Sequence, residues 1–179
     1  SFPTRRSSDL GAWEACESGV ALVVDDGPVN LQVRAVDLAG NEDLTPATRS
    51  FTLDATAPDT TIDSGPADGS RTKSTEITFA FSSSEPTDAT FECQVDDGDW
   101  ASCVTPFTTD PLADGAHTFK VRATDMAGNT DASAAAVTFT VDTVAPVATI
   151  TTADPAEGVA TKVNQPAFEF ESDKAGSVF

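Results

Sequence analysis

The acidic side chains around a repeated loop are the residues with the clearest capacity for chemistry. The pattern DxAGN occurs at residues 37–41 and again at residues 125–129. In a turn, the aspartate would accept hydrogen bonds from backbone amides, while glycine and asparagine tolerate positive φ, so a structural turn is the favoured interpretation. The alternative is a calcium site, because Ca²⁺ takes six to eight oxygen ligands. One loop cannot supply that many, so a calcium site needs acidic residues from elsewhere.

The direction of the strands decides which residues could join this loop. If the strands of a small sandwich alternate in direction, loops 82–88 and 125–131 lie at the end where the chain enters the domain, beside Asp54. Close carboxylates would repel by about 1 kcal/mol per pair in a water-like dielectric unless a cation lies between them. A solvated acidic surface, screened by salt, is the competing interpretation. The candidate calcium ligands are Asp54, Glu85, Asp88, Asp125, Asn129 and Asp131.

A second acidic group is expected at the opposite end of the same domain, and contains Asp96, Asp97, Asp99 and Asp142. At either end calcium would make a joint between domains rigid and would take no part in a reaction. No cofactor is required by the sequence.

Catalysis is not indicated by the remaining titratable residues. His117 is the only histidine, and a general base needs a positioned partner and a pocket. It begins a predicted strand, and Val29 lies at the matching position 88 residues earlier, which favours a packing role. We expect no catalytic residue and no enzymatic activity in this chain.

The three cysteines predict one disulfide. Cys93 and Cys103 lie in the same complete repeat, while Cys16 aligns with Cys103 through GAWEAC and GDWASC. Cys16 is expected to be unpaired because its partner would precede residue 11. If Cys93 lies directly opposite Cys103, the hairpin has a three-residue loop at 97–99 with a bulge. The disulfide would contribute about 2.7 kcal/mol in the chain-entropy model and implies an oxidising, extracytoplasmic site.

Two tryptophans recur three residues before a cysteine, at Trp13 and Trp100. An exposed Trp100 could stack on a carbohydrate ring, and it is the candidate ligand-contact residue. A tryptophan packed over a disulfide is commoner in sandwiches, so packing is the favoured interpretation.

An internal repeat of about 88 residues organises the chain. This spacing separates Gly40 from Gly128, and Pro58 from Pro146. The predicted divisions are residues 11–56 as the end of one repeat, 57–142 as a complete repeat and 143–179 as the start of a third. The joints DATAP and DTVAP contain proline, which restricts the backbone to extended conformations, so they are expected to be stiff.

Period-two alternation predicts an all-β fold for the complete repeat. Apolar residues alternate with polar ones around Phe79, Cys93, Val121 and Phe139, as expected for strands with one buried face. Shorter strands are predicted at 60–63, 100–103 and 106–109. Seven strands over this length indicate a β-sandwich.

The order of three motifs gives the resemblance to a known family. FECQVDDGDWASC, LADGAHTFKVRATDMAGNTD and VTFTVDTVAP resemble the tandem bacterial immunoglobulin-like repeats of secreted and surface proteins. The resemblance implies an Ig-like or fibronectin III-like sandwich that serves as an extracellular spacer or adhesion module. It departs from antibody-type domains, because the chain has no tyrosine and both cysteines lie on one hairpin. Residues 1–10, SFPTRRSSDL, instead resemble a translated sequencing adapter and are treated as artefactual.

The charge excludes several classes of partner. The formal net charge is −19, and nucleic acid and anionic membranes both require basic patches. No nucleic-acid partner and no membrane insertion are expected; the partners expected are neighbouring repeats, and a surface glycan or protein receptor is left open. The predicted function is an extracellular structural or adhesion spacer. The alternative is an accessory domain of a secreted polysaccharide-degrading enzyme that contacts glycan through Trp100.

Overall fold

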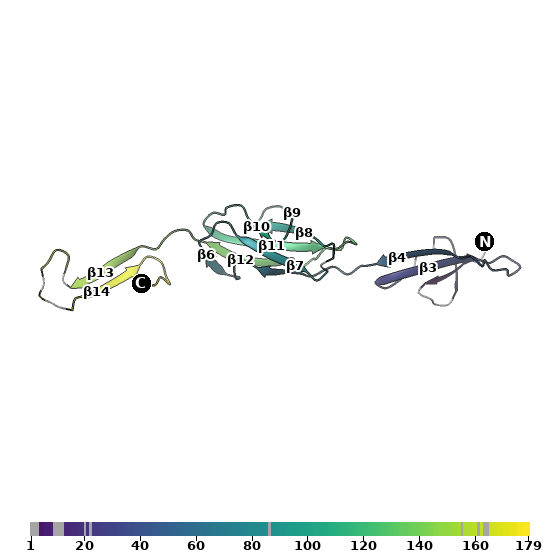
Figure 1. The fold of residues 1–179 in the computed structure, drawn as a ribbon, viewed down its shortest axis with the longest axis horizontal. Coiled ribbons are helices and arrows are strands. Elements are labelled where there is room, and N and C mark those ends of the chain that lie inside the picture. The colour runs from purple at the N-terminus through teal and green to yellow at the C-terminus, as the bar shows by residue number, and fades with distance from the viewer. Residues whose placement is uncertain are drawn as a thin grey trace. The chain divides into compact units, whose positions relative to one another are not determined.

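The computed structural model is all-β, which confirms the predicted fold class. It describes residues 4–8, 13–19, 21, 23–85, 87–154, 156–160, 162 and 165–179. Within them, fourteen strands form four sheets (Figure 1). No helix in the described ranges is long and apolar enough to cross a membrane. By packing, residues 1–65, 78–107 and 118–136 make one compact unit, and residues 66–77, 108–117 and 137–179 make a second.

Two sheets formed between residues 60 and 141 carry the core. Both the sheet composition and the alternation of buried residues fit an Ig-like β-sandwich. The three-stranded sheet has the order β10 (Phe107–Thr108), β7 (Thr78–Ser83) and β5 (Thr60–Ser64). The five-stranded sheet has the order β6 (Ser70–Thr72), β12 (Ala135–Val141), β11 (Gly115–Thr124), β8 (Thr90–Val95) and β9 (Ala101–Cys103).

Phenylalanine rings fill the space between the strands. Phe79 of β7 stacks on Phe119 of β11 with ring centroids 3.9 Å apart, and both side chains are fully buried. Phe107 stacks on the same ring at 5.7 Å. Every second residue of β11, from Phe119 to Ala123, is fully buried, as the alternation predicted. Burying one such aromatic side chain contributes roughly 1.5–3 kcal/mol, so these rings supply much of the hydrophobic stabilisation.

One strand was not predicted. β6 pairs in parallel with β12, with Ser70 opposite Phe139. Its sequence, SRT, is too short and too polar to show an alternating pattern. The strand is held instead by hydrogen bonds to the backbone and by Asp68, whose Oδ1 accepts from the backbone N and the hydroxyl of Thr138 at 2.9 and 2.7 Å.

The predicted register of the β8–β9 hairpin is wrong, although the disulfide is present. Cys93 and Cys103 are bonded with their Cα atoms 5.8 Å apart. Cys103 lies opposite Phe91, and Cys93 lies opposite Ala101, so the cysteines are diagonal neighbours. Diagonal side chains on one face are still close enough to meet. The turn contains a hydrogen bond from Gly98 N to Val95 O at 3.1 Å, and the observed pairing does not place the loop at residues 97–99 as predicted.

Two further sheets lie outside these strands. The first has the order β2 (Glu14–Cys16), β1 (Thr4–Ser8), β3 (Gly27–Ala35) and β4 (Ala47–Leu53), the same succession as β9, β8, β11 and β12. The second pairs β13 (Ala148–Asp154) with β14 (Ala167–Ser172). The shared succession supports the duplication. The boundaries 11–56, 57–142 and 143–179 and the adapter origin of residues 1–10 stay predictions.

Candidate functional site

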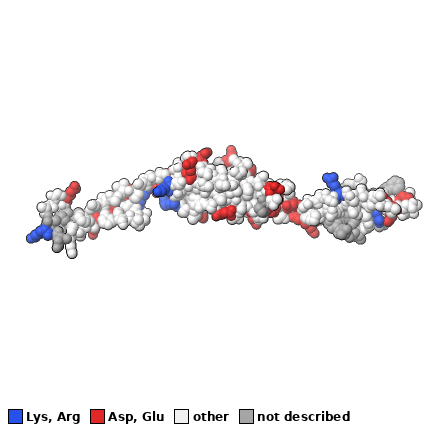
Figure 2. Space-filling model, viewed as in Figure 1, with Lys and Arg blue, Asp and Glu red and all other residues white. Residues whose placement is uncertain are grey.

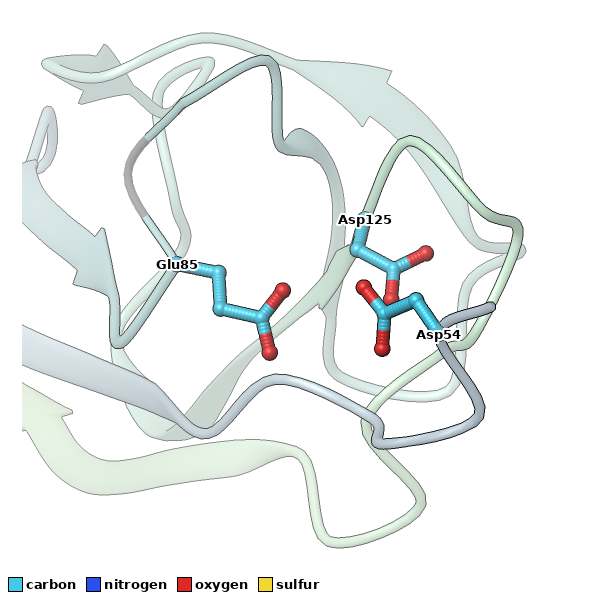
Figure 3. Close-up of side chains that lie close together, drawn as sticks. All are labelled: Asp54, Glu85 and Asp125. Carbon is cyan, nitrogen blue, oxygen red and sulfur yellow. The ribbon is translucent and has the colours of Figure 1, made fainter. Parts of the chain in front are cut away.

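Three carboxylates converge at the ends of three strands. Asp54 follows β4, Glu85 lies two residues after β7 ends, and Asp125 follows β11. One carboxylate oxygen from each lies within 4.8 Å of the others (Figure 3). All three residues belong to the first compact unit. The structure thus brings together half of the six candidate calcium ligands, one from the joint and two from loops.

Asp125 is held in place by its own loop. Its Oδ1 accepts hydrogen bonds from the backbone amides of Gly128 and Asn129 at 2.7 and 2.8 Å, and its Oδ2 accepts from Asn129 Nδ2 at 2.8 Å. Burial acts to raise the pKa of Asp125, but the hydrogen bonds from Asn129 and Gly128 outweigh it, and the pKa is lowered. The turn predicted for DxAGN is therefore confirmed, and its aspartate is ionised at neutral pH.

The earlier copy of this loop has the same internal bonds. Asp37 Oδ1 accepts from the backbone amide of Asn41 at 2.8 Å, and Asp37 Oδ2 accepts from Asn41 Nδ2 at 2.7 Å. The loop geometry is thus encoded locally by DxAGN and does not depend on the neighbouring carboxylates. The second copy lies beside two further carboxylates, those of Asp54 and Glu85.

Glu85 shows the electrostatic cost of this arrangement. Partial burial raises its pKa, and the negative charges of Asp54 and Asp125 raise it further. Among the described residues, no ion pair joins any of the three carboxylates to lysine or arginine. Like charges without a neutralising partner favour protonation or the binding of a cation. The group is therefore electrostatically suited to a positive ligand.

The other three candidate ligands have different positions. Asn129 donates its Nδ2 to Asp125 and, at 3.0 Å, to the backbone carbonyl of Asp54, so its amide fastens the joint to the loop. Asp131 is buried, and its Oδ2 accepts from Thr60 N at 2.9 Å, which secures the start of β5. Asp88 is exposed and has a positive φ of 63°. Neither Asp88 nor Asp131 belongs to the group of three close carboxylates in the described structure.

Two joint residues were missed by the sequence reasoning. Asp26 Oδ1 accepts from Ala55 N at 3.2 Å, and Asp114 Oδ1 accepts from Thr143 N at 3.1 Å. These aspartates are 88 residues apart and each precedes a glycine, so the repeat itself could have revealed them. They tie the backbone of each joint to the loop before β3 or β11.

Trp100 has an unexpected partner. The guanidinium of Arg122 lies 4.4 Å from the centre of its ring and also bonds Glu92, with Nε–Oε2 and Nη2–Oε2 distances of 2.9 and 2.7 Å. Arg34 lies over Trp13 in the same way, at 4.3 Å. A cation–π contact of this kind covers one face of the indole ring. The signal for this contact in the sequence was the recurrence of arginine 88 residues apart, at Arg34 and Arg122.

His117 and Cys16 show no catalytic arrangement in the described residues. His117 Nε2 lies 2.8 Å from the backbone carbonyl oxygen of Ala113, and its ring packs against Phe139 with centroids 5.8 Å apart. Cys16 is half-buried and lies outside the disulfide. These contacts give His117 a role in packing.

The comparison with protein families agrees with this architecture. Residues 55–143 match the profile of the bacterial Ig-like domain family. No curated protein sequence matches the chain. Among solved structures, it is similar to the fibronectin(III)-like modules of Clostridium thermocellum CbhA, with a TM-score of 0.38 and 21% identity over 78% of this chain and 77% of that one. It is also similar to a tetra-tandem repeat from the extending region of a large adhesion protein, with a TM-score of 0.34 and 16% identity over 97% of this chain; it spans 55% of that structure.

Proposed function

Since residues 55–143 belong to the bacterial Ig-like domain family, we propose that this chain is a non-catalytic extracellular spacer or adhesion segment made of consecutive repeats. We further propose that a calcium ion at Asp54, Glu85 and Asp125 makes the joint at residues 54–59 rigid. The observation that carries the second proposal is the convergence of three carboxylates within 4.8 Å.

Several contacts support a spacer with ordered joints. Each joint is short, contains proline and has its backbone bonded to an aspartate of the preceding repeat. The disulfide between Cys93 and Cys103 suits an oxidising, extracytoplasmic environment. A net charge of −19 favours solubility and disfavours adhesion to nucleic acid. A spacer needs these properties and needs no active site.

The chemistry of the three carboxylates supports calcium as the ligand. Together they offer six oxygen atoms, and calcium accepts carboxylates in either monodentate or bidentate form, with carbonyl oxygens and water completing the shell. A divalent cation would offset the repulsion that raises the pKa of Glu85. Because Asp54 belongs to the joint while Glu85 and Asp125 belong to loops of the following repeat, binding would restrain the joint.

Calorimetric titration of the full chain with calcium tests this proposal. We expect one site, and we expect Glu85→Gln to weaken it about tenfold or more because a full charge leaves the ligand set. Asp88→Asn is the matched control, since Asp88 is exposed in the same loop and asparagine tolerates its positive φ. Absence of binding at millimolar calcium, or equal losses in both variants, would overturn the calcium proposal.

A glycan-contacting accessory domain has less support. Arg122 already covers one face of Trp100, so only the other face and the ring edge could meet a sugar. Titration of the chain with polysaccharides, followed by tryptophan fluorescence, tests this alternative. A spectrum that changes in the wild type and not in Trp100→Phe would favour it over the spacer.

A further inference from the structure

The two joints of the chain have matching backbone contacts. In the first, Asp59 and Ser84 are linked from Asp59 N to Ser84 Oγ and from Ser84 N to Asp59 O, each at 2.9 Å. In the second, Val147 N donates to Asp173 Oδ1 at 2.7 Å and Asp173 N donates to Val147 O at 3.2 Å. Ser84 and Asp173 therefore occupy the same structural position.

The next residues are equivalent as well. Glu85 N donates to Ser83 Oγ at 3.1 Å, and Lys174 N donates to Ser172 Oγ at 3.2 Å. Asp54 likewise corresponds to Asp142, 88 residues later. The two joints thus have the same backbone framework, but a lysine stands in the second where a glutamate stands in the first.

Lys174 uses this position to reach the joint. Its Nζ donates to Asp142 Oδ1 at 2.6 Å and also to the backbone carbonyl of Val144. Both charged side chains are about one-third exposed, at 30% and 32%. The ammonium therefore binds a carboxylate and a carbonyl oxygen, which are the atom types that a metal cation would bind. All of these residues lie in the second compact unit.

The surrounding charge makes this contact distinctive. Acidic side chains are spread over the visible face in Figure 2, whereas basic ones occur in few places. Arg71 Nη1 adds a weaker contact to Asp142 Oδ2 at 4.0 Å. Asp142 is thus neutralised by side chains of the chain itself, while no ion pair in the described structure reaches Asp54.

We propose that Lys174 is a built-in cation that orders the joint at residues 142–147 without calcium. The ammonium links Asp142, at the end of β12, to the turn after β14, and it fixes Val144 between them. The contrast with a calcium-dependent joint at 54–59 rests on the proposed function, whereas the role of Lys174 in its own joint does not.

Amide ¹⁵N relaxation and hydrogen exchange of the full chain in EDTA test this proposal, since both joints are observed in one molecule. In Lys174→Met, we expect the amides of residues 142–145 and of Val147 to exchange about two- to fivefold faster, the range of a partly exposed ion pair, and to lose order in the heteronuclear NOE. Lys162→Met is the matched control because Lys162 is exposed in the same repeat. Unchanged amides in Lys174→Met, or the same change in both variants, would overturn the proposal.

A double-mutant cycle tests whether Lys174 acts on the joint through Asp142. Asp142→Asn should loosen the same amides, and adding Lys174→Met to it should have a smaller effect than Lys174→Met has alone, because the contact between Nζ and the Asp142 carboxylate is already lost and only the bond to Val144 O remains. Additive effects would show that Lys174 does not act through Asp142. The resonances of β7 and β11 serve as the check that each variant remains folded.

A substitution in the first joint separates this proposal from the calcium proposal. Glu85→Lys places an ammonium at the position of Lys174, so residues 54–59 should become ordered in EDTA and calcium should have no further effect. If wild-type calcium binding is absent but Lys174→Met and Glu85→Lys behave as expected, only the calcium proposal fails. If calcium orders residues 54–59 while Glu85→Lys leaves them mobile in EDTA, the built-in cation proposal fails.

Discussion

The joints at residues 54–59 and 142–147 differ in charge far more than in backbone. Asp54 and Asp142 each cap the amide two residues later, at 3.2 and 3.3 Å. Beyond that, Asp54 faces two further carboxylates, whereas Asp142 faces an ammonium. The comparison teaches that a repeat can keep the hydrogen bonds that shape a joint while the charges of the side chains around that joint change.

The largest loss of stability is expected from removing the disulfide, a change that should leave both joints as they are. Replacing both Cys93 and Cys103 with serine should lower the free energy of unfolding by about 2.7 kcal/mol through the loss of an 11-residue closed loop. Urea unfolding with and without a reductant measures this. The amides of both joints should be unaffected, and loosening of either joint would mean that domain stability and joint order cannot be separated.

A smaller loss is expected from Asp131→Ala. This buried carboxylate accepts hydrogen bonds from Thr60 N and Ser133 N, and leaving those amides without partners should cost about 1–3 kcal/mol. Thermal unfolding in calcium and in EDTA should show the same loss in both buffers. A loss that appears only in calcium would instead make Asp131 a ligand and extend the group of three carboxylates.

The shared framework predicts equal effects at the two joints. Asp26→Ala and Asp114→Ala each remove the bond to the amide that directly follows Asp54 or Asp142, at Ala55 and Thr143. Exchange of those amides should quicken by similar factors, on the order of severalfold, since surface bonds of this kind are weak. Very different factors would show that charge also decides the backbone order of the joints.

Lowering the pH should stabilise the first joint and destabilise the second. These are the smallest effects that we expect. The pKa of Glu85 is raised, so in EDTA the first joint should gain stability as the pH falls from neutral through that pKa and the repulsion is relieved. The pKa of Asp142 is lowered, first by its hydrogen bond from Lys174, so the second joint should lose stability progressively as the pH falls from the ordinary carboxyl pKa through that lower value. Amide order at Thr56 and Val144, followed during an acid titration, measures both.

Calcium should remove the acid-induced gain at the first joint, because a bound cation already offsets the charge of Glu85. In Glu85→Gln the gain should be absent in either buffer. An acid response that persists in Glu85→Gln would show that Glu85 is not its source.

The sequence predicted the features that depend on periodic patterns. The buried alternation of β7, β11 and β12, the DxAGN turns and the pairing of Cys93 with Cys103 all follow from local spacing. The hairpin register did not, because a disulfide joins diagonal as well as opposite cysteines. β6 was missed because its pairing with β12 depends on backbone bonds across the fold and leaves no mark on the sequence SRT.

The site was predicted in outline from topology. Strand direction placed Asp54, Glu85 and Asp125 at one end, but the sequence could not show that Asn129 and Asp131 direct their polar atoms to Asp54 O and Thr60 N. The alignment of the two repeats places Lys174 at the position of Glu85. The sequence could not show that Lys174 bonds Asp142, because that contact depends on side-chain conformation at a position where the two repeats differ.

The exchange of glutamate for lysine at one structural position has a genetic consequence. Glutamate and lysine codons differ only in their first base, so one nucleotide substitution separates a joint at which three carboxylates converge from one that carries its own positive charge. A gene that encodes many such repeats could therefore acquire, by single mutations, a pattern of joints that respond to the ionic composition of the surroundings and joints that do not.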